Sequence, residues 1–555
     1  MKFKVLLGGL AALSLSASSF AQAPDTGPGD FSADAFRAHV TFLADDLLEG
    51  RDTGSRGHEI AARYVASEFA SLGLRPGNGD SWYQQVGFVR AANDPGATLI
   101  VDGQTFAQGR DIALRASAAG AASVEAPLVF AGYGLDMPAH GLNDYRGLDV
   151  RGKIVVVLSG TPAGLETDVA AHLDSDKRRM AAARGAVGLI TIRTRADGGA
   201  VPWARLVRFA DRPLTTWTEP DGAPFDGAPG LRFAATVNDS VANLLFQGAV
   251  RSYEAVLDEA AVRGARPAGF ALRQTARLNR AAGEATRFTS PNVVAILPGS
   301  DPALAGEYVL LMAHLDHIGI RNPRPDDAPN ADRINNGAMD NATGIATLIE
   351  VAREMSRPGN RPRRPILFAA VTGEEKGELG SQYLALHPIV RGGHVIGVVN
   401  LDMPVLTYDF RDVIAFGAEH STLGPIVQRA AARMGVSLSP DPLPQEGLFT
   451  RSDHYKFVLE GIPSVFLMTG FANGGRERFT DFLARHYHRP SDDLSLPINW
   501  EAGARFARLN YLIAREIADG AEVPRWYRGS FFGDAFGGNQ PRAPQPAAMA
   551  TGAGH

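Results

Sequence analysis

The chain has 555 residues, which at roughly 150 residues per domain predicts several folded units or one large domain that carries an insertion. Apolar residues make up 45%, charged residues 21%, and the net charge is −5, so the sequence excludes a disordered or fibrous chain and offers no basic surplus for a nucleic-acid or membrane-surface partner. It contains 13 histidines and no cysteine, which excludes disulfides and thiol chemistry and leaves His, Asp and Glu as the ligands for any metal.

Residues 1–21 are predicted to be a secretory signal peptide. Lys2 and Lys4 precede an apolar run from Val5 to about Leu15, and small residues follow, which is the layout of such a signal. The apolar run is too short to span a bilayer, although an uncleaved membrane anchor is the alternative. We therefore expect a secreted or periplasmic protein with no stable membrane insertion after the signal is removed.

Shifts in sequence pattern divide the rest of the chain into four segments. The first begins with apolar residues at helical spacing, the second has short β-rich runs around an alanine-rich helix, the third alternates strands and helices, and the last is rich in Gly, Pro, Ala and Gln. The predicted segments are the amino-terminal part of the main domain (30–120), an inserted β-rich domain (121–284), the main part of that domain (285–520) and a low-complexity, disordered tail (527–555).

The alternation of strands and helices in residues 285–520 predicts an α/β fold with a mixed, largely parallel central sheet flanked by helices. Short apolar runs without alternation are typical of strands that are buried on both faces. Four such runs are expected to be strands: Tyr308–Ala313, Ile366–Val371, Val395–Leu401 and Ser464–Met468.

Side chains that can bind metal follow three of these strands. His314 and Asp316 follow the first, Glu374 and Glu375 the second, and Asp402 the third. Ligands of open α/β sheets bind at the carboxyl ends of the strands, so these residues are expected to lie together. Further candidates are Asp340, which precedes an amphipathic helix, and the histidine pair His486 and His488, which lies in a loop rich in turn-forming residues.

Each of these residues has an ordinary explanation when it is considered alone. An aspartate before a helix is usually an N-cap, a pair of glutamates is usually solvated, and a single histidine usually makes structural hydrogen bonds. These explanations would have to hold independently at every strand end, whereas one metal site accounts for all of them. The combined pattern therefore favours a metal site.

The set of His, Asp, Glu, Asp and His suits two zinc ions about 3.5–4 Å apart. Each ion would take one imidazole and one terminal carboxylate, and an aspartate fixed at a helix N-terminus would bridge the two ions. Adjacent residues diverge as the chain leaves a strand. One of Glu374 and Glu375 can therefore bind metal, while the other is placed to take a proton from the attacking water.

Several motifs carry a resemblance to a known family. They are "AHLDHIG", "NGAMDNATG", "TGEEKGELGSQY", "NLDM", "SDHYKF" and "YHRPSDD", in an order and spacing that match through roughly 285–520. This set resembles the co-catalytic zinc aminopeptidases, the family of bacterial leucyl aminopeptidase and the glutamate carboxypeptidases. The segment "VTFLADDLLEGRDTGSRGHEIAARYVASEFASLGLRP" resembles the amino-terminal part of the same domain. The resemblance implies a zinc exopeptidase fold with two Zn²⁺ per chain.

The resemblance also implies a role for each site residue. Asp316 would orient the first histidine, and Asp453 and Asp492 are weaker candidates for supporting contacts, with loop capping as the alternative. The implied roles are His314 and Asp402 on one zinc, Glu375 and His488 on the other, Asp340 as the bridge and Glu374 as the general base.

The inserted segment has a weaker resemblance of its own. The runs "PLVFAGYG", "DYRGLDVRGKIVVVLSG" and "KRRMAAARGAVGLITI" resemble the protease-associated domain that interrupts many members of this family. A short β-rich insert could also be any lid, so this assignment is an expectation about fold alone.

The sequence predicts a dizinc aminopeptidase that acts on peptide substrates. A free amine beside the metals can be received by a carboxylate such as Asp402, whereas a carboxypeptidase needs cations, for which Arg451, Arg476 and Arg478 are candidates. A carboxypeptidase or dipeptidase on the same scaffold is therefore the closest alternative. A cyclase of N-terminal glutamine would use one zinc, and an inactive binding ectodomain is the alternative from another class.

Overall fold

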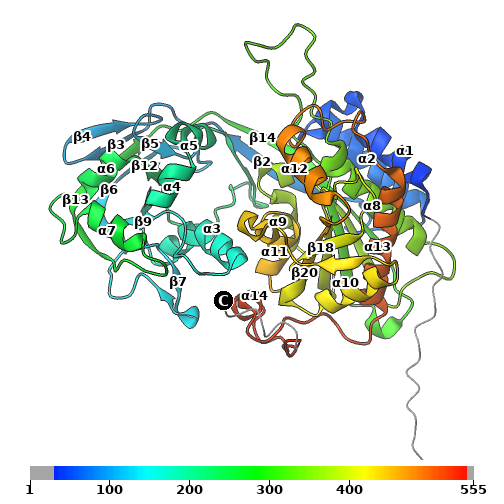
Figure 1. Ribbon diagram of the computed structural model, residues 1–555. Helices are drawn as coiled ribbons and strands as arrows, with labels where there is room; N and C mark the ends of the chain where they lie inside the picture. The colour runs from blue at the N-terminus through cyan, green and yellow to red at the C-terminus, as the bar shows by residue number, and fades with distance from the viewer. Residues whose placement is uncertain (1–30, 547–555) are drawn as a thin grey trace, which may run out of the picture.

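The computed structural model describes residues 31–546 and shows an α/β protein built around two large β-sheets (Figure 1). The predicted signal peptide lies outside the described residues, as do residues 547–555 of the predicted tail. Within residues 31–546, no helix has both the length and the apolar character needed to cross a membrane.

The first sheet has ten strands, and its centre is parallel. Strands β16, β15, β17 and β20 lie side by side in parallel, whereas the pairs that flank them on both sides are antiparallel. The predicted α/β fold with a mixed sheet is confirmed, and its parallel pairs are those of this centre and the edge pair of β18 and β19. In order, with β1 (Arg75–Pro76) beside β14, the strands are β11 (Leu214–Trp217), β2 (Tyr83–Ala91), β14 (Ala285–Leu297), β16 (Ile366–Val371), β15 (Glu307–His314), β17 (His394–Leu401), β20 (Ser464–Thr469), β18 (Asp412–Phe416) and β19 (Ser437–Ser439).

Strand β15 is buried on both faces, which explains its unbroken apolar sequence. Val309 and Leu311 pack in the large cluster that contains α8, while Leu310 and Met312 pack in a second cluster with Leu384 of α9 and with α11. Successive side chains of a strand point to opposite faces, so one apolar run serves two layers of helices. The four strands expected in residues 285–520 are all present, each extended by at most one residue at either end.

Helices cover both faces of the first sheet. Helices α1, α8 and α13 pack on one another over one face, and α9 packs with α11 over the other. The side chains of Ser32, Ser55 and Asn499 accept hydrogen bonds from backbone N–H groups in the first turns of α1, α2 and α13, as N-caps do. The helices of this region are α1 (Ala33–Leu43), α2 (Arg56–Ser71), α8 (Thr343–Met355), α9 (Leu379–Leu386), α10 (Leu423–Ala432), α11 (His454–Leu459), α12 (Gly475–Arg485) and α13 (Trp500–Asp519).

The second sheet lies beside the first and is covered by helices of its own (Figure 1). Its strand order is β4 (Gln104–Ala107), β3 (Thr98–Val101), β13 (Phe270–Arg280), β6 (Ala122–Phe130), β9 (Ile154–Leu158), β10 (Gly188–Ile192), β12 (Ala234–Val237) and β5 (Ile112–Leu114). The remaining elements here are the short pair β7 (Asp136–Met137) and β8 (Leu142–Asn143) and the helices α3 (Thr167–Ala183), α4 (Arg195–Ala200), α5 (Trp203–Ala210), α6 (Asp239–Leu245) and α7 (Tyr253–Ala260).

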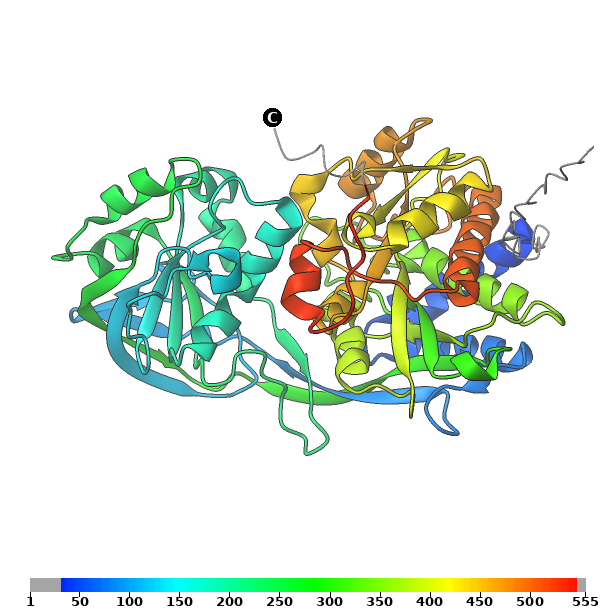
Figure 2. The ribbon, with the colours of Figure 1, turned by 90° about the horizontal axis from the view of Figure 1, so that it is seen from below.

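The boundaries of this region differ from the expected 121–284. Strands β3, β4 and β5 belong to the second sheet, because β3 pairs with β13 and β5 with β12, so the region begins near Thr98. In the opposite sense, β11 lies within the expected insert but pairs with β2 at the edge of the first sheet. The long strands β2 and β14 run side by side toward the second sheet, with Ala91 opposite Ala285 (Figure 2). The chain therefore leaves and re-enters the first sheet at adjacent points.

Trp217 of β11 anchors that strand to the main domain. Its side chain is buried, it stacks on Phe225 with ring centroids 4.2 Å apart, and its Nε1 donates to Oε1 of Gln382 at 2.9 Å. We expect Trp217→Ala to lower the free energy of unfolding by about 3–5 kcal/mol, since it removes a large buried side chain. Urea unfolding measures this loss. The matched control is Trp203→Ala on α5, where the side chain is only half-buried and a smaller loss is expected. A loss below about 1 kcal/mol for Trp217→Ala would contradict the anchoring role.

The carboxyl-terminal segment is ordered as far as residue 546, in contrast to the expected disordered tail. It contains α14 (Phe531–Phe536), and Trp526 and Phe532 are buried. Nε1 of Trp526 donates to the backbone oxygen of Gly461 at 2.8 Å. The composition of this segment is biased, but its aromatic side chains supply enough apolar surface to pack on the domain.

Candidate functional site

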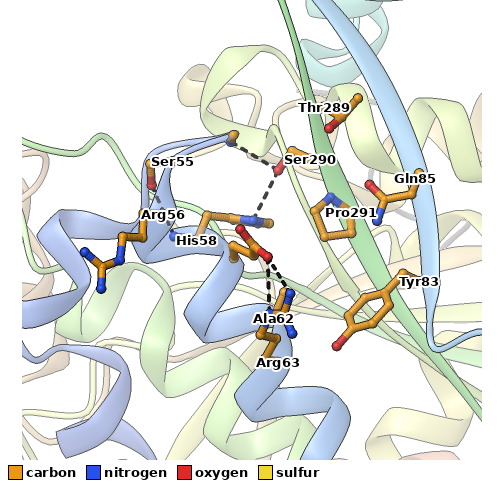
Figure 3. A pocket seen from close by; sticks show the side chains of 12 residues that line it. Ser55, Arg56, His58, Ala62, Arg63, Tyr83, Gln85, Thr289, Ser290 and Pro291 are labelled. Carbon is orange, nitrogen blue, oxygen red and sulfur yellow. Dashed lines mark hydrogen bonds and ion pairs between the residues drawn. The ribbon is translucent and has the colours of Figure 1, made fainter.

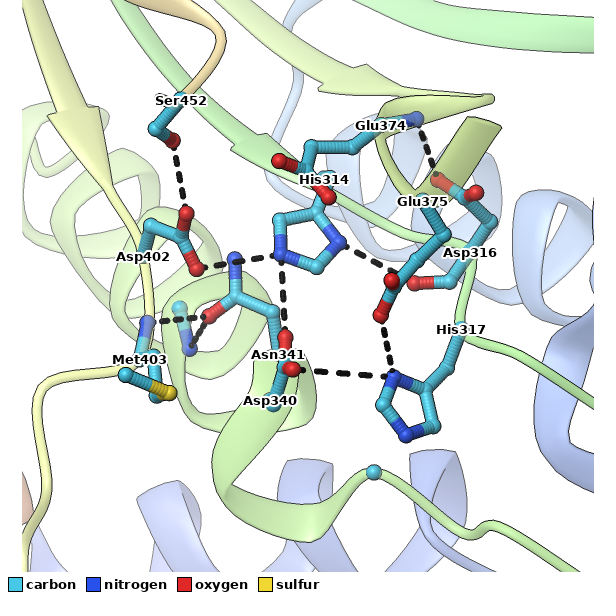
Figure 4. A network of polar contacts seen from close by, with 12 residues as sticks. His314, Asp316, His317, Asp340, Asn341, Glu374, Glu375, Asp402, Met403 and Ser452 are labelled. Carbon is cyan, nitrogen blue, oxygen red and sulfur yellow. Dashed lines mark hydrogen bonds and ion pairs between the residues drawn. The ribbon is translucent and has the colours of Figure 1, made fainter. Parts of the chain in front are cut away.

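Three neighbouring parallel strands end at one edge of the first sheet, and the predicted site residues lie there (Figure 4). His314 is the last residue of β15, Glu374 and Glu375 follow β16, and Asp402 directly follows β17. Asp340 reaches the same place from the turn that precedes α8. The structure thus brings together residues that are up to 88 positions apart in the sequence.

A first group of potential metal ligands consists of His314, Asp340 and Asp402. Nε2 of His314 lies 3.0 Å from Oδ1 of Asp402 and 3.2 Å from Oδ1 of Asp340, and all three residues are buried. The other oxygen of Asp402 accepts a hydrogen bond from the Ser452 hydroxyl at 2.6 Å. One imidazole nitrogen and two carboxylate oxygens therefore converge on one point.

A second group shares Asp340 with the first. Nε2 of His488 lies 3.3 Å from Oδ2 of Asp340 and 3.1 Å from Oε2 of Glu375. His317 also belongs here, because its Nδ1 lies 2.7 Å from Oε1 of Glu375 and 3.8 Å from Oδ2 of Asp340. The two oxygens of Asp340 thus face different groups, which is the geometry of a bridging carboxylate.

His317 is the site residue that the sequence reasoning missed. It lies in "AHLDHIG", three positions after His314, and its ring is fully buried while the side chain of His488 is 35% exposed. The second histidine of that motif was the available signal. The second group therefore contains two histidines, of which His317 is the more deeply buried.

Asp340 is held in place by its neighbours rather than by helix geometry alone. Its backbone N–H donates to Oδ2 of Asp492 at 3.1 Å, and the N–H of Met339 donates to Oδ1 at 2.8 Å. The buried guanidinium of Arg51 donates to the backbone oxygens of Asn336 and Gly337 just before this turn. Asp492 thus makes the supporting contact proposed for it, and Arg51 is a further support that the sequence did not reveal.

Asp316 contacts His314 in a different way from that expected. Its backbone oxygen, not its carboxylate, lies 3.1 Å from Nδ1 of His314. The carboxylate instead accepts from the Thr53 hydroxyl at 2.8 Å and from the backbone N–H of Glu374 at 3.2 Å. The expected carboxylate contact is therefore wrong, because these two donors hold the side chain of Asp316. A carbonyl oxygen can still fix the tautomer and the ring orientation of the histidine.

The electrostatics of the site favour positive charge at its centre. Burial alone lowers the pKa of His314, but the carboxylates of Asp402 and Glu374 raise it well above its usual value. The pKa of His488 is raised to about 10 against the effect of burial, by hydrogen bonds to Asp340 and Glu375. Burial opposes the ionisation of Glu375, yet its contacts with the histidines lower its pKa to about 2.

These donors fit a pair of divalent cations. Protons on the imidazoles would otherwise have to balance the buried carboxylates, and a metal ion supplies the same charge while using unprotonated nitrogens as ligands. Nε2 of His317 is buried without a hydrogen bond to any described residue, while its Nδ1 and Oε1 of Glu375 lie 2.7 Å apart without the geometry of a hydrogen bond. The mixture of imidazole and carboxylate donors is one that zinc accepts.

The comparisons with known proteins agree with this site. The family described as Peptidase family M28 matches residues 292–514. We call this matched segment the M28 domain. The chain is 27% identical over 216 residues to "Leucine aminopeptidase 1" of Trichophyton rubrum, covering 38% of this chain and 53% of that protein. It is 36% identical over 115 residues to a "Probable zinc metalloprotease" of Pyrenophora teres f. teres (strain 0-1), covering 20% and 22%.

The match to curated relatives is therefore partial, since the chain spans about half the length of the first and less of the second. Among solved structures, the "Aminopeptidase from Aneurinibacillus sp. strain AM-1" is similar with a TM-score of 0.47 and 20% identity, covering 89% of this chain and 95% of that one. The relative from Pyrenophora teres f. teres carries zinc in its name.

Glu374 lies beside both groups of ligands in the M28 domain. It lines a small cavity of about 60 Å³ together with His314, Asp340 and Asp402. Burial raises its pKa well above the usual value, and the carboxylates of Glu375 and Asp402 raise it further against the effect of His314. A carboxylate with a raised pKa is suited to accept and return a proton near neutral pH.

The rest of this cavity is apolar apart from one arginine. Its further lining residues are Met403, Leu448, Arg451, Phe466, Met468 and Tyr487. Asp453 lies behind the site, and burial raises its pKa to about 8. Neither carboxylate oxygen of Asp453 makes a hydrogen bond to a described residue, so its predicted supporting contact is not seen.

A larger pocket of about 440 Å³ lies at the start of α2, away from these ligands (Figure 3). Two pairs of its polar side chains contact each other, since Arg63 lies 2.6 Å from Glu59 and Nδ1 of His58 lies 3.1 Å from the Ser290 hydroxyl. No group of potential metal ligands among the described residues includes a residue of this pocket. The chemistry of the M28 domain is therefore concentrated in the smaller cavity.

Proposed function

We propose that this protein is a dizinc aminopeptidase that removes the first residue from peptides. The observation that carries the proposal is the sharing of Asp340 between two groups of ligands, with Glu374 beside them in the same cavity. A polar cluster that only stabilised the fold would not need a carboxylate whose two oxygens face two separate groups of histidines.

The contacts support the ligand sets that the family resemblance implies. His314 and Asp402 would hold one zinc ion, Glu375 and His488 the other, and Asp340 would bridge them. His317, which contacts Glu375 at 2.7 Å, either joins the second set or fixes the orientation of that glutamate. When bound, two zinc ions lower the pKa of a water molecule and polarise the carbonyl group of the scissile peptide bond.

Glu374 moves the proton that hydrolysis requires. Its carboxylate accepts a proton from the attacking water and later delivers it to the nitrogen of the leaving amine. The hydrogen bond from its own backbone N–H to Asp316 fixes the start of this turn and leaves the side chain free to face the cavity. Proton transfer by Glu374 and metal binding by Glu375 thus fall to adjacent residues.

The charges around the cavity favour an amino terminus over a carboxyl terminus. Three carboxylates line it, those of Asp340, Glu374 and Asp402, against one arginine, Arg451, whose side chain is 56% exposed. A protonated amine is attracted by such a surface, whereas the carboxylate of a peptide is repelled. Met403, Phe466 and Met468 add apolar surface that suits an apolar first side chain.

We expect a leucine or alanine anilide with a free amine to be hydrolysed, and the same compound acetylated on nitrogen to resist. The physical reason is that acetylation removes the positive charge that the carboxylates of the cavity would bind. Release of the aniline measures both rates. If an acetylated peptide is instead processed from its carboxyl end at comparable kcat/KM, the protein is a carboxypeptidase and the aminopeptidase assignment is wrong.

Export from the cytoplasm is a further part of the proposal. It is supported by the basic start and the short apolar run of residues 1–21. Peptides are the substrates proposed, and the protease-associated character of the second-sheet region remains a prediction from sequence resemblance.

A further inference from the structure

A third group of potential metal ligands lies where the second-sheet region meets the M28 domain. Glu166 and Asp168 stand at the start of α3 in the second-sheet region, and His420 lies in the short helical turn Ala418–His420 of the M28 domain. One ligand atom from each of the three residues lies within 4.8 Å of the others. None of these residues belongs to the two groups around Asp340.

Two members of this group, Asp168 and His420, are buried with polar atoms that make no hydrogen bond to each other. Asp168 and His420 are 6% and 7% exposed, and neither Oδ1 of Asp168 nor Nε2 of His420 makes a hydrogen bond to a described residue. The imidazole is enclosed by the rings of Phe449 and Phe532, whose centroids lie 5.0 and 4.9 Å from its own. Leaving such groups unpaired costs free energy, so the arrangement calls for a partner.

The separations around His420 are longer than those of direct ion pairs. Nε2 of His420 lies 4.0 Å from Oδ2 of Asp168 and 3.8 Å from Oε1 of Glu419. A charged imidazole bound directly to a carboxylate would approach to about 2.7–2.9 Å. Two ligand atoms on one tetrahedral zinc ion, each bonded at about 2.0–2.2 Å, lie roughly 3.3 Å apart, so small side-chain movements would close this group around an ion.

We propose that Glu166, Asp168 and His420 bind a third divalent metal ion, of the zinc type, that fastens α3 to the M28 domain. One imidazole and two carboxylates form a donor set suited to zinc and other divalent transition metals. Burial raises the pKa of the neighbouring Glu419, and the Asp168 carboxylate raises it further against the effect of His420.

The position of the group gives the ion a structural purpose. Beyond Asp168, α3 packs against the segment that holds Gly447, where an added Cβ would come within 3.0 Å of the Cβ of Ala171. Leu448 and Arg451, which line the active-site cavity, follow directly. The Tyr455 hydroxyl, farther along, lies 2.7 Å from Nδ1 of His172 in α3. An ion at the start of α3 would therefore steady one wall of the cavity from outside it.

The test counts zinc in the full-length protein. The chain is incubated with excess Zn²⁺, freed of unbound metal by gel filtration and analysed for zinc per chain, and the same is done for His420→Gln and Glu166→Gln. We expect each variant to hold about one zinc fewer than the unaltered protein. Glu166 is exposed, so Glu166→Gln removes a ligand without disturbing a packed side chain.

Thermal unfolding supplies the second measurement. Zn²⁺ that binds only the folded chain raises its Tm, so added Zn²⁺ should raise the Tm of the unaltered protein more than that of either variant. The matched controls are Asp174→Asn, on the same helix, and His140→Gln, outside the group, and both should behave as the unaltered protein does. If the unaltered protein and both ligand variants have equal zinc content and equal Tm shifts, the proposal is wrong. Glu166, Asp168 and His420 are then a cluster of charged side chains that binds no metal. This test involves no residue of the dizinc site, so its failure does not bear on the peptidase assignment.

Discussion

Replacing Glu374 with glutamine should reduce kcat by about 10²–10⁴-fold while the zinc content stays at the level of the unaltered protein. The substitution keeps the volume of the side chain and removes its ability to carry a proton. Zinc analysis and hydrolysis of a leucine anilide measure the two quantities on the same preparation.

The structure explains why metal binding should survive this change. Glu374 lines the cavity with His314 and Asp402. The contacts that Asp340 makes with His314 and that Glu375 makes with His488 do not involve its side chain. The hydrogen bond of Glu374 to Asp316 comes from its backbone N–H, which glutamine retains. The altered side chain therefore affects the reaction and not the support of the ligands.

The adjacent residue provides the matched control. Oε1 of Glu375 contacts His317 at 2.7 Å and Oε2 contacts His488 at 3.1 Å. Glu375→Gln replaces one of these oxygens with an NH₂ group and removes the charge, so zinc content and activity should fall together. If the Glu374→Gln variant retained its turnover, the assignment of Glu374 as the general base would be wrong. If Glu374→Gln lost metal and Glu375→Gln kept it, the two glutamates would exchange roles.

The central strands and the residues that follow them were predictable because a strand that is buried on both faces has a continuous apolar sequence. A strand such as β16 that is covered on both faces reads as an unbroken apolar run, Ile366–Val371, and the polar residues after it must leave the sheet at its edge. Parallel pairing then brings several such edges together. The place where His314, Glu375 and Asp402 meet follows from these local signals.

The extent of the second sheet was not predictable from local pattern. Strand β3 is stabilised by pairing with β13, with Leu99 opposite Leu278, and nothing near residue 99 indicates a partner so far along the chain. Strand β11 likewise joins the first sheet from within the inserted region. Long-range pairing of this kind is decided by the whole fold, and short strands carry little periodicity of their own.

Two features of the site could not be predicted from the sequence. His317 and His488 both contact Glu375, at 2.7 Å and 3.1 Å, so sequence spacing alone did not separate their roles. The contact between His314 and the backbone of Asp316 depends on which donors hold the aspartate side chain, and one of them, Thr53, lies 263 positions away. Sequence indicates which residue types gather at a site, whereas their contacts depend on side-chain orientation.

Asp340→Asn should cost the protein about two zinc ions per chain. Turnover should fall by more than the factor of about 10⁴ that is the most expected for loss of a general base. Oδ1 of Asp340 lies 3.2 Å from Nε2 of His314, and Oδ2 lies 3.3 Å from Nε2 of His488, so a single side chain serves both groups. An amide retains one oxygen ligand but replaces the other with an NH₂ group, which carries no charge and cannot coordinate zinc. Zinc analysis, anilide hydrolysis and Tm on the same variant measure the outcome.

Asp492→Asn is the matched control for this prediction, because Asp492 holds the backbone of the same turn without contributing a predicted ligand. Its oxygens accept from the N–H groups of Met339 and Asp340, and asparagine can still accept one of these bonds. We expect zinc affinity to fall by about 10–100-fold, as it does when a group that orients a ligand is lost, with both ions recovered at high zinc concentration. If Asp340→Asn also recovered both ions and full turnover at high zinc, Asp340 would be no more than another orienting residue. Each zinc would then need its ligands from His314, Asp402 and the cluster of Glu375 with its two histidines, without a shared carboxylate.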